Sequence, residues 1–289
     1  PDLTPEIHKE LELGIEAKFF KNRVGVDVSL YTKDSEDLII DLDLDNSTGY
    51  SSSTVNSASI NNKGVEAILN VIPVQSRDFT WDVSASFSLL RSEVISIADG
   101  IDQIYVGGYV GRGNIAIPGL PYGILEGEVI RRDYGSLDGT DHTQVHWDDR
   151  TNYTPIVNAN GGYQFLGYGV IGNPQPDFVY GVTNTLSYKW ATLRVQFDSQ
   201  VGGDVFSTTN STLLGRGILQ ETDFDRFVPV VTKGLSADGT PNTTQTTANA
   251  HYWPNTGVFY DENSIYDASV MRLRDCLLYT SPSPRDNTL

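Results

Sequence analysis

Few residues in the chain are spaced as a catalytic or metal site would require. His142 and His146 are four positions apart and have carboxylates close by, a set that could hold zinc on a helix. A metalloprotease needs Glu directly after the first His, where Thr143 stands, and Asp138-Gly139 just before it indicates a turn. We interpret this segment as a polar loop and predict no metal site.

An acidic segment imitates the first half of a calcium loop, with Asp41, Asp43 and Asp45 at alternate positions. Such a loop needs Gly at its sixth position and an acid at its twelfth, where Asn46 and Ser52 stand. The apolar residues between these acids favour a strand that runs up into a loop.

Nucleophilic and phosphate-binding motifs are missing from the sequence. There is no Ser/His/Asp order and no Gly-x-Ser-x-Gly elbow. The glycine-rich run 107–113 lacks the following Lys-Ser/Thr of a phosphate loop, so we interpret it as a flexible loop. We expect no enzymatic activity and no cofactor.

Aromatic residues in the long polar segments are better candidates for ligand binding. Sugars and peptides dock on such rings, which combine apolar area with a polar tip. The alternative is that each ring packs one loop against another. The candidate ligand-binding residues are Trp147, Tyr153, Tyr252 and Trp253.

Strict alternation of apolar and polar residues is the strongest pattern, and it predicts strands with one apolar face. It is clearest over 79–89, where one side carries Phe79, Trp81, Val83, Ala85, Phe87 and Leu89. It recurs over 11–19, 24–30, 65–71 and 191–197, and more loosely over 178–188. These segments predict an all-β fold.

The connections between these strands alternate in length. Those at 20–23, 73–78 and 188–190 are short, whereas about 46–61, much of 91–177 and about 199–263 are long and polar. An antiparallel sheet with tight turns at one rim and long loops at the other gives this pattern.

Either membrane lipid or a protein core could cover the apolar faces of these strands. Strands of about 9–11 residues, aromatic strand ends and charged polar faces favour a transmembrane barrel. We predict an antiparallel transmembrane β-barrel. The alternative is a secreted soluble β-sandwich that binds carbohydrate. The residues predicted to face the lumen are Glu12, Glu16, Asp27, Glu66 and Asp82.

The net charge and the single Cys and Met further restrict the class of protein. The formal charge of −17 argues against nucleic acid as a partner, because that role requires a basic patch. The single Cys excludes a disulfide framework. The single Met is Met271, near the far end, so we expect a processed product or a fragment.

Short motifs between residues 3 and 275 resemble, in order, the C-terminal barrel of SusC/RagA-type TonB-dependent transporters. These proteins are outer-membrane nutrient importers of Bacteroidetes. Within one motif we interpret Gly64 as an entry into a strand. The motifs are L-x-P-E at 3–6, F-F-x-N-R at 19–23, N-K-G-V-E at 62–66, D-F-x-W at 78–81, G-N-P-x-P-D-F at 172–178, G-G-D at 202–204 and D-A-S-x-x-R-L-R at 267–274.

The resemblance implies that residues 1–275 are the C-terminal part of such a barrel, a partial antiparallel transmembrane β-barrel of about eight to ten strands with long extracellular loops and short periplasmic turns. It also implies location in the outer membrane, contact with its lipid, and import of glycan oligomers or peptides with TonB coupling. The expected partners are a SusD-like surface lipoprotein and TonB, the latter through an N-terminal part with a plug domain that this chain lacks.

The last residues do not resemble the family. Residues 276–286 are similar to a translated transposase sequencing adaptor, whereas the family continues with an apolar strand and a terminal aromatic residue. Pro282 and Pro284 would also interrupt a strand. We therefore expect 276–289 to be an artefact derived from the adaptor.

Overall fold

The computed structural model describes residues 3–43, 46–109, 111–133, 149, 152–248 and 260–280. The chain divides into two compact units. Unit 1 comprises Pro1–Gly100, Gln175–Gly203 and Ala268–Leu289, and unit 2 comprises Ile101–Pro174 and Asp204–Asp267.

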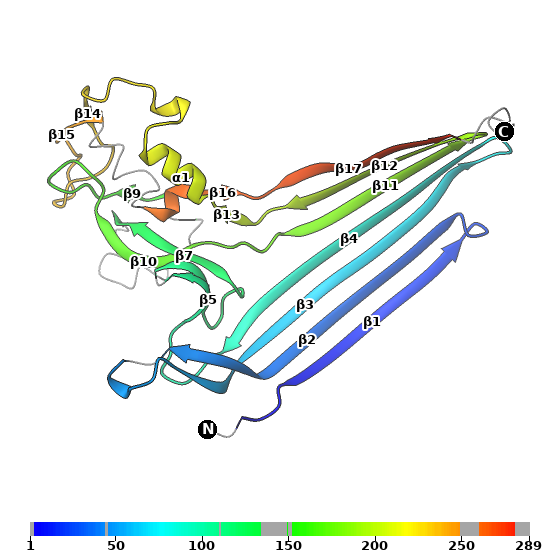
Figure 1. Ribbon diagram of the computed structural model, residues 1–289, viewed down its shortest axis with the longest axis horizontal. Coiled ribbons are helices and arrows are strands. Elements are labelled where there is room, and N and C mark those ends of the chain that lie inside the picture. The colour runs from blue at the N-terminus through cyan, green and yellow to red at the C-terminus, as the bar shows by residue number, and fades with distance from the viewer. Residues whose placement is uncertain are drawn as a thin grey trace, which may run out of the picture. The chain divides into compact units, whose positions relative to one another are not determined.

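Unit 1 contains one antiparallel sheet in the order β1-β2-β3-β4-β11-β12-β17, with β1 and β17 at its edges (Figure 1). The sheet is therefore a partial barrel. Its strands are β1 (Ile7–Phe19), β2 (Val24–Asp43), β3 (Ser52–Gln75), β4 (Phe79–Ser96), β11 (Phe178–Tyr188), β12 (Ala191–Val201) and β17 (Val270–Thr280). The sheet has seven strands, where the family resemblance implies about eight to ten. Residues 101–174 and 204–267 belong to unit 2 and add no strand to this sheet.

The predicted strands are confirmed, but several are longer than the alternation indicates. The expected long connection at 46–61 is wrong, because β2 continues to Asp43 and β3 begins at Ser52. Polar contacts hold this extension together. The Thr54 hydroxyl donates to the Asp41 carboxylate, and the Asn56 amide donates to the Asp37 carbonyl oxygen at 2.7 Å. The apolar residues between the acids at 41–45 predict the β2 part of this hairpin, whereas residues 52–61 are mostly polar and do not reveal the β3 part.

The turn between β1 and β2 combines an unusual backbone with a side-chain anchor. Phe20, Lys21 and Asn22 all have positive φ, at 53°, 56° and 66°. The Arg23 guanidinium donates to the carbonyl oxygens of Ile72 at 3.1 Å and Pro73 at 3.0 Å. The turn is thereby tied to β3.

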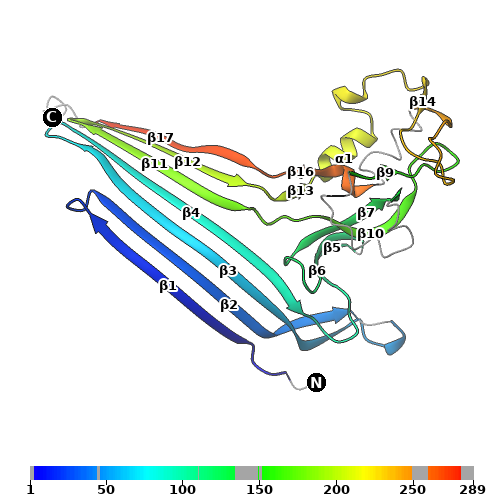
Figure 2. The same ribbon diagram turned by 180° about the vertical axis from the view of Figure 1, so that it is seen from behind.

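The apolar residues of the strands form one continuous face of the sheet. Phe87 of β4 is directly opposite Ala67 of β3 and Tyr180 of β11, and Val182 is opposite Phe197 of β12. On β1, Leu11, Leu13 and Ile15 are 63%, 67% and 72% exposed. The strands lie side by side in the reverse view as well (Figure 2). A large apolar surface is therefore uncovered.

Unit 2 is built around a sheet in the order β10-β7-β6-β5, with Ile115, Ile124 and Ile130 fully buried. The strands of this sheet are β5 (Ile104–Tyr109), β6 (Arg112–Ala116), β7 (Ile124–Ile130) and β10 (Phe165–Gly172). Three short pairs accompany it: β8 (Arg132–Asp133) with β9 (Thr154–Pro155), β13 (Asp204–Phe206) with β16 (Ile265–Asp267), and β14 (Pro229–Val231) with β15 (Gln245–Thr247).

The described helices are short and lie at the ends of strands and in loops. They are α1 (Thr208–Gly215) and the 3-10 turns η1 (Asn46–Thr48), η5 (Gln220–Thr222) and η6 (Asp261–Ser264). Within the part of the chain that the structure describes, none of the helices has the length and apolar character needed to cross a membrane.

The glycine-rich run 107–113 is not the expected flexible loop, because it joins β5 and β6 in a hairpin. Gly108 has φ 98°, in the left-handed region that favours glycine. A Cβ on Gly113 would lie 2.2 Å from the carbonyl oxygen of Gly107. Glycine here permits a close approach of two backbones.

Strand β17 includes the first five residues of the segment that resembles an adaptor. Leu277 is opposite Arg194 and Tyr279 is opposite Thr192. Both therefore occupy positions on the face that is polar in the other strands. Residues 281–289 lie outside the described residues.

Candidate functional site

The acidic residues predicted to face a lumen share one face of the sheet of unit 1. Glu16 is directly opposite Asp27, and Ser29 is directly opposite Glu66. Alternate residues of a strand point to the same face, so the pairing fixes the whole set. The residues on this polar face include Glu12, Glu16, Asp27, Glu66 and Asp82.

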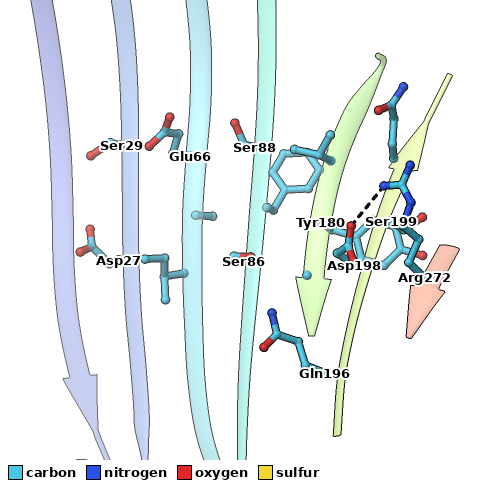
Figure 3. Close-up of a pocket in the computed structure, with 16 residues that line it drawn as sticks. Asp27, Ser29, Glu66, Ser86, Ser88, Tyr180, Gln196, Asp198, Ser199 and Arg272 are labelled. Carbon is cyan, nitrogen blue, oxygen red and sulfur yellow. Dashed lines mark hydrogen bonds and ion pairs between the residues drawn. The ribbon is translucent and has the colours of Figure 1, made fainter. Parts of the chain in front are cut away.

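A hollow of about 570 Å³ lies in this polar face. Strands β2 and β3 form one side of it, β4 and β11 its floor, and β12 and β17 the other side (Figure 3). Its polar lining residues include Asp27, Ser29, Glu66, Ser86, Ser88, Gln196, Asp198, Ser199, Gln200 and Arg272. We take this hollow as the candidate functional site.

Small residues create the hollow. Ser86 and Ser88 of β4 and Gly181 of β11 form its floor. A Cβ on Gly181 would lie 3.0 Å from the Ser86 hydroxyl oxygen, so a larger side chain would press on its neighbour. Longer side chains stand on the flanking strands, which leaves the middle open.

One side of the hollow is acidic, and the other side carries an ion pair. Asp27 and Glu66 come from β2 and β3 (Figure 3). Across the floor, Asp198 lies 3.5 Å from the Arg272 guanidinium and accepts a hydrogen bond from Arg274 at 3.1 Å. Only Asp27 and Glu66 of the five predicted residues line the hollow; Glu12, Glu16 and Asp82 lie elsewhere on the same face.

Asp198 and Gln200, on the β12 side, were missed because the predicted strand ends at residue 197. They continue the polar side of that strand, which includes Gln196, to its observed end at Val201. The signal was present as an unbroken alternation of polar residues. Arg272 lies within the R-L-R motif, where it had no assigned role.

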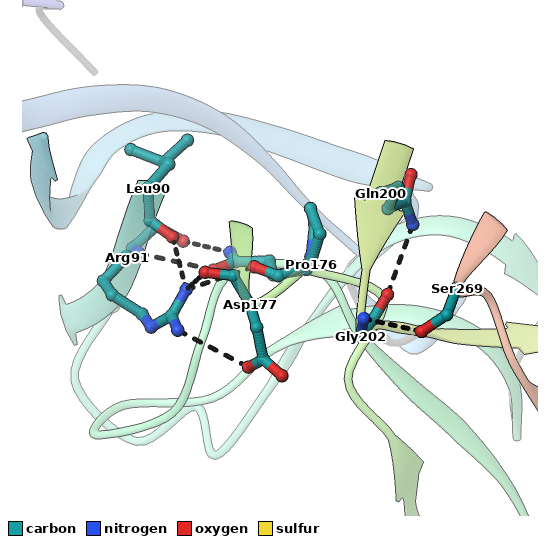
Figure 4. A network of polar contacts seen from close by, with 9 residues as sticks. Leu90, Arg91, Pro176, Asp177, Gln200, Gly202 and Ser269 are labelled. Carbon is teal, nitrogen blue, oxygen red and sulfur yellow. Dashed lines mark hydrogen bonds and ion pairs between the residues drawn. The ribbon is translucent and has the colours of Figure 1, made fainter. Parts of the chain in front are cut away.

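The rim of the sheet is fixed by a network of polar contacts (Figure 4). The Arg91 guanidinium donates to the backbone oxygens of Leu90, Pro176 and Asp177 at 3.0–3.1 Å. The Gly202 amide donates to the Ser269 hydroxyl at 2.8 Å. Together these contacts tie the ends of β4 and β12 to the segments that lead into β11 and β17.

The hollow offers carboxylates, hydroxyls, amides and one guanidinium, which suit hydrogen bonding to a polar ligand or protein segment. Across the described ranges, no cluster of three or more His, Cys, Asp or Glu side chains could hold a metal ion. His142 and His146 lie outside those ranges.

The predicted aromatic contacts belong to a different part of the chain. Tyr153 is half-buried and directly precedes β9 of unit 2. Trp147, Tyr252 and Trp253 lie outside the described residues. Another loop pair illustrates simple packing, because the Tyr260 hydroxyl donates to the Tyr163 carbonyl oxygen at 2.6 Å and the two rings meet edge to face.

The soluble β-sandwich gains no support from unit 1. A sandwich needs a second sheet against the apolar face of the first. In the described part of unit 1 the strands form one sheet only, and the apolar residues of β1 stay exposed.

Comparison with known proteins connects this sheet to one family. The model of the family "TonB dependent receptor-like, beta-barrel" matches residues 1–198. TonB-dependent receptor P3 of Formosa agariphila is 29% identical over 223 residues, which cover 73% of this chain and 22% of that protein. TonB-dependent receptor SusC of Bacteroides thetaiotaomicron is 23% identical over 241 residues, covering 78% and 23%. The chain thus spans less than a quarter of these relatives.

Solved structures have the same fold. The structure of the RagAB peptide transporter matches with a TM-score of 0.65 and 19% identity, over 95% of this chain and 29% of that one. The RagAB peptide importer in its "open-open" state matches with a TM-score of 0.63 and 18% identity, over 96% and 28%. With the family model matching more than half of its residues, the chain belongs to the TonB dependent receptor-like β-barrel family.

Proposed function

We propose that the chain forms part of the wall and outer loops of an outer-membrane transporter that imports glycan oligomers or peptides with TonB coupling. The observation that carries this proposal is the two-faced sheet of unit 1. One face is apolar and exposed, and the other is polar and hollowed. The family consists of receptors and transporters, not enzymes.

The apolar face suits outer-membrane lipid. In water, exposed residues such as Leu11, Leu13 and Ile15 would form an apolar patch that favours aggregation. In a bilayer the same side chains contact acyl chains. Strands β11 and β12 have 11 residues each, which matches a tilted crossing of the hydrocarbon core.

The polar face suits the interior of a barrel. Lumenal positions of transmembrane barrels are polar and alternate with the lipid-facing ones. Glu12, Glu16, Asp27, Glu66 and Asp82 would then line the lumen. The hollow between Asp27 and Arg272 would contact a polar segment inside the barrel or a ligand in transit.

The proposed partners follow from the relatives. The curated relatives are named TonB-dependent receptors, and RagAB is a peptide transporter. By similarity we propose coupling to TonB through the N-terminal part of the whole protein, and a SusD-like surface lipoprotein over the outer loops. Trp147, Tyr153, Tyr252 and Trp253 are proposed ligand contacts in those loops.

Uptake by cells tests the proposal. The gene for the full-length protein is expressed, with its neighbouring lipoprotein, in a host from which the native copy is deleted. Fluorescent glycan oligomers and peptides are supplied with and without a protonophore, and in a host lacking TonB. We expect uptake of one class that requires TonB and the proton gradient. Uptake that persists without TonB would contradict coupled transport.

A further inference from the structure

A β-bulge in β10 places two aromatic residues on one face of the sheet of unit 2. Phe165 is opposite Ile130 and Tyr168 is opposite Glu128 of β7, with a register shift between them. Residues three apart in a regular strand point to opposite faces. Because the bulge inserts one extra residue, and Ile130 and Glu128 are two apart, Phe165 and Tyr168 share a face.

The bulge holds the two rings in fixed geometry. Their centroids are 5.7 Å apart and their planes are inclined by 76°, an edge-to-face contact. Leu166, between them, packs against the buried cluster of Leu125, Val129 and Ile171. Leu166 is the extra residue, because Phe165 and Gly167 pair with the adjacent residues Ile130 and Val129. Gly167, directly after it, has a φ of 148°, which favours glycine. The pair is therefore anchored to the core although it stands at the surface.

Both rings remain open to solvent. Phe165 is 48% exposed and Tyr168 is 54% exposed, so about half of each side chain is open to solvent. The Tyr168 ring packs against the backbone at Gly111, where a Cβ would lie 2.6 Å from the ring carbon Cε1. Glycine at position 111 therefore makes room for the ring.

Hydrogen-bonding groups lie beside the rings. The Glu128 side chain, opposite Tyr168, is 23% exposed, and the Arg112 guanidinium lies 3.8 Å from its carboxylate. Arg112 is fixed by Asp261, which is fully buried and 2.7 Å away. The Glu128 backbone amide also donates to Asp261, at 3.0 Å. An acceptor and a donor thus stand next to two exposed aromatic rings.

We propose that Phe165, Tyr168 and Glu128 bind a sugar ring of a neutral glycan. The apolar C–H face of a sugar packs on aromatic rings, while its hydroxyls need acceptors and donors together, as Glu128 and Arg112 provide. A basic peptide side chain would instead compete with Arg112 for the carboxylate. The net charge of −17 disfavours anionic polymers. This inference rests on the proposed function and narrows its substrate to glycans.

Binding by the purified full-length protein tests the site. Calorimetry in detergent micelles uses five probes: maltohexaose, cellohexaose, laminarihexaose, mannohexaose and xylohexaose. For a hexasaccharide that the wild type binds, we expect Phe165→Ala and Tyr168→Ala each to weaken affinity about tenfold, equivalent to the loss of about 1.4 kcal/mol. Tyr168→Phe, which keeps the ring, should stay within about threefold. Phe227→Ala serves as the matched control, because Phe227 is an aromatic residue of unit 2 that is 82% exposed.

The outcomes separate this inference from the proposed function. Unchanged affinity of the two alanine variants, or equal losses in the control, would overturn the site. Binding of peptides but of none of the five hexasaccharides would overturn the assignment to neutral glycans, while TonB-dependent uptake would still stand. If cells import no oligomer of either class, the proposed function itself fails.

Discussion

The ring of Tyr31 lies against the backbone of Gly64, its directly opposed partner on the neighbouring strand. A Cβ on Gly64 would be 2.3 Å from the ring carbon Cζ and 2.4 Å from the hydroxyl oxygen. Gly64 lies well inside β3, so the interpretation of this glycine as a strand entry is wrong. The motif N-K-G-V-E carries its glycine to accommodate a cross-strand tyrosine.

Gly64→Ala is expected to destabilise the barrel by about 1–3 kcal/mol, because the Tyr31 ring must move away from its strand. The measurement is the thermal midpoint of unfolding of the full-length protein, monitored through the change in its gel mobility when it unfolds. In a Tyr31→Ala background the same substitution should have little effect. Equal losses in both backgrounds would show that the ring contact is not the cause.

Asp261→Ala is expected to destabilise unit 2 by about 1–3 kcal/mol, because it removes the partner of Arg112 and leaves the Glu128 amide without its acceptor. Limited proteolysis of the full-length protein reports the loss through faster cleavage within residues 101–174. Asp238→Ala removes an exposed aspartate of the same unit and is the control. Similar cleavage rates in both variants would contradict a special role for the buried Asp261 carboxylate.

The stability of unit 2 should depend on pH in part through the Glu128 carboxyl. Burial raises the pKa of the Glu128 carboxyl, the nearby Asp261 carboxylate raises it further, and Arg112 lowers it. The folded state therefore holds this proton more tightly than the unfolded chain. The resulting stabilisation is complete below about pH 4.5 and is lost as the pH rises through the raised pKa.

Glu128→Gln cannot titrate and should remove that part of the pH slope. Thermal midpoints measured between pH 4 and pH 7 check this, with the wild type falling more steeply than the variant. A variant with the same slope as the wild type would mean that Glu128 does not contribute.

The strands that the sequence predicts best are those with one apolar and one polar face, such as 79–89 within β4. The β3 part of the hairpin around Asp41 and Thr54 was missed, because polar residues and their hydrogen bonds form it. The bulge at Leu166 was also missed. Its effect is to bring Phe165 and Tyr168 together, which a rule of strict alternation assigns to opposite faces.

The residues of the hollow were likewise predictable only in part. The sequence predicts that Asp27 and Glu66 share a face, since alternation fixes this within each strand. It does not predict that Asp198 and Arg272 complete the other side, because that depends on the order of strands far apart in the chain. Pairing of β4 with β11 and of β12 with β17 supplies this information.

The native codons after Asp275 are expected to differ from those of the present sequence. Leu277 and Tyr279 put apolar side chains on the polar face, against the pattern of the other strands. We propose that residues 276–289 derive from an adaptor. Sequencing of the source DNA without transposase treatment should show polar residues at these two positions. Recovery of the same codons would contradict an adaptor origin.

The central claim is that the apolar face of the sheet contacts lipid and the polar face lines a water-filled lumen. Nitroxide labels at single cysteines test it most directly, at Leu13 and Ile15 for one face and at Glu12 and Glu16 for the other. The full-length protein is placed in lipid bilayers, with Cys276 replaced by serine if present. We predict that accessibility to oxygen is high at 13 and 15 and that accessibility to a water-soluble nickel chelate is high at 12 and 16, with a period of two. High nickel accessibility at all four positions, without alternation, would contradict the claim.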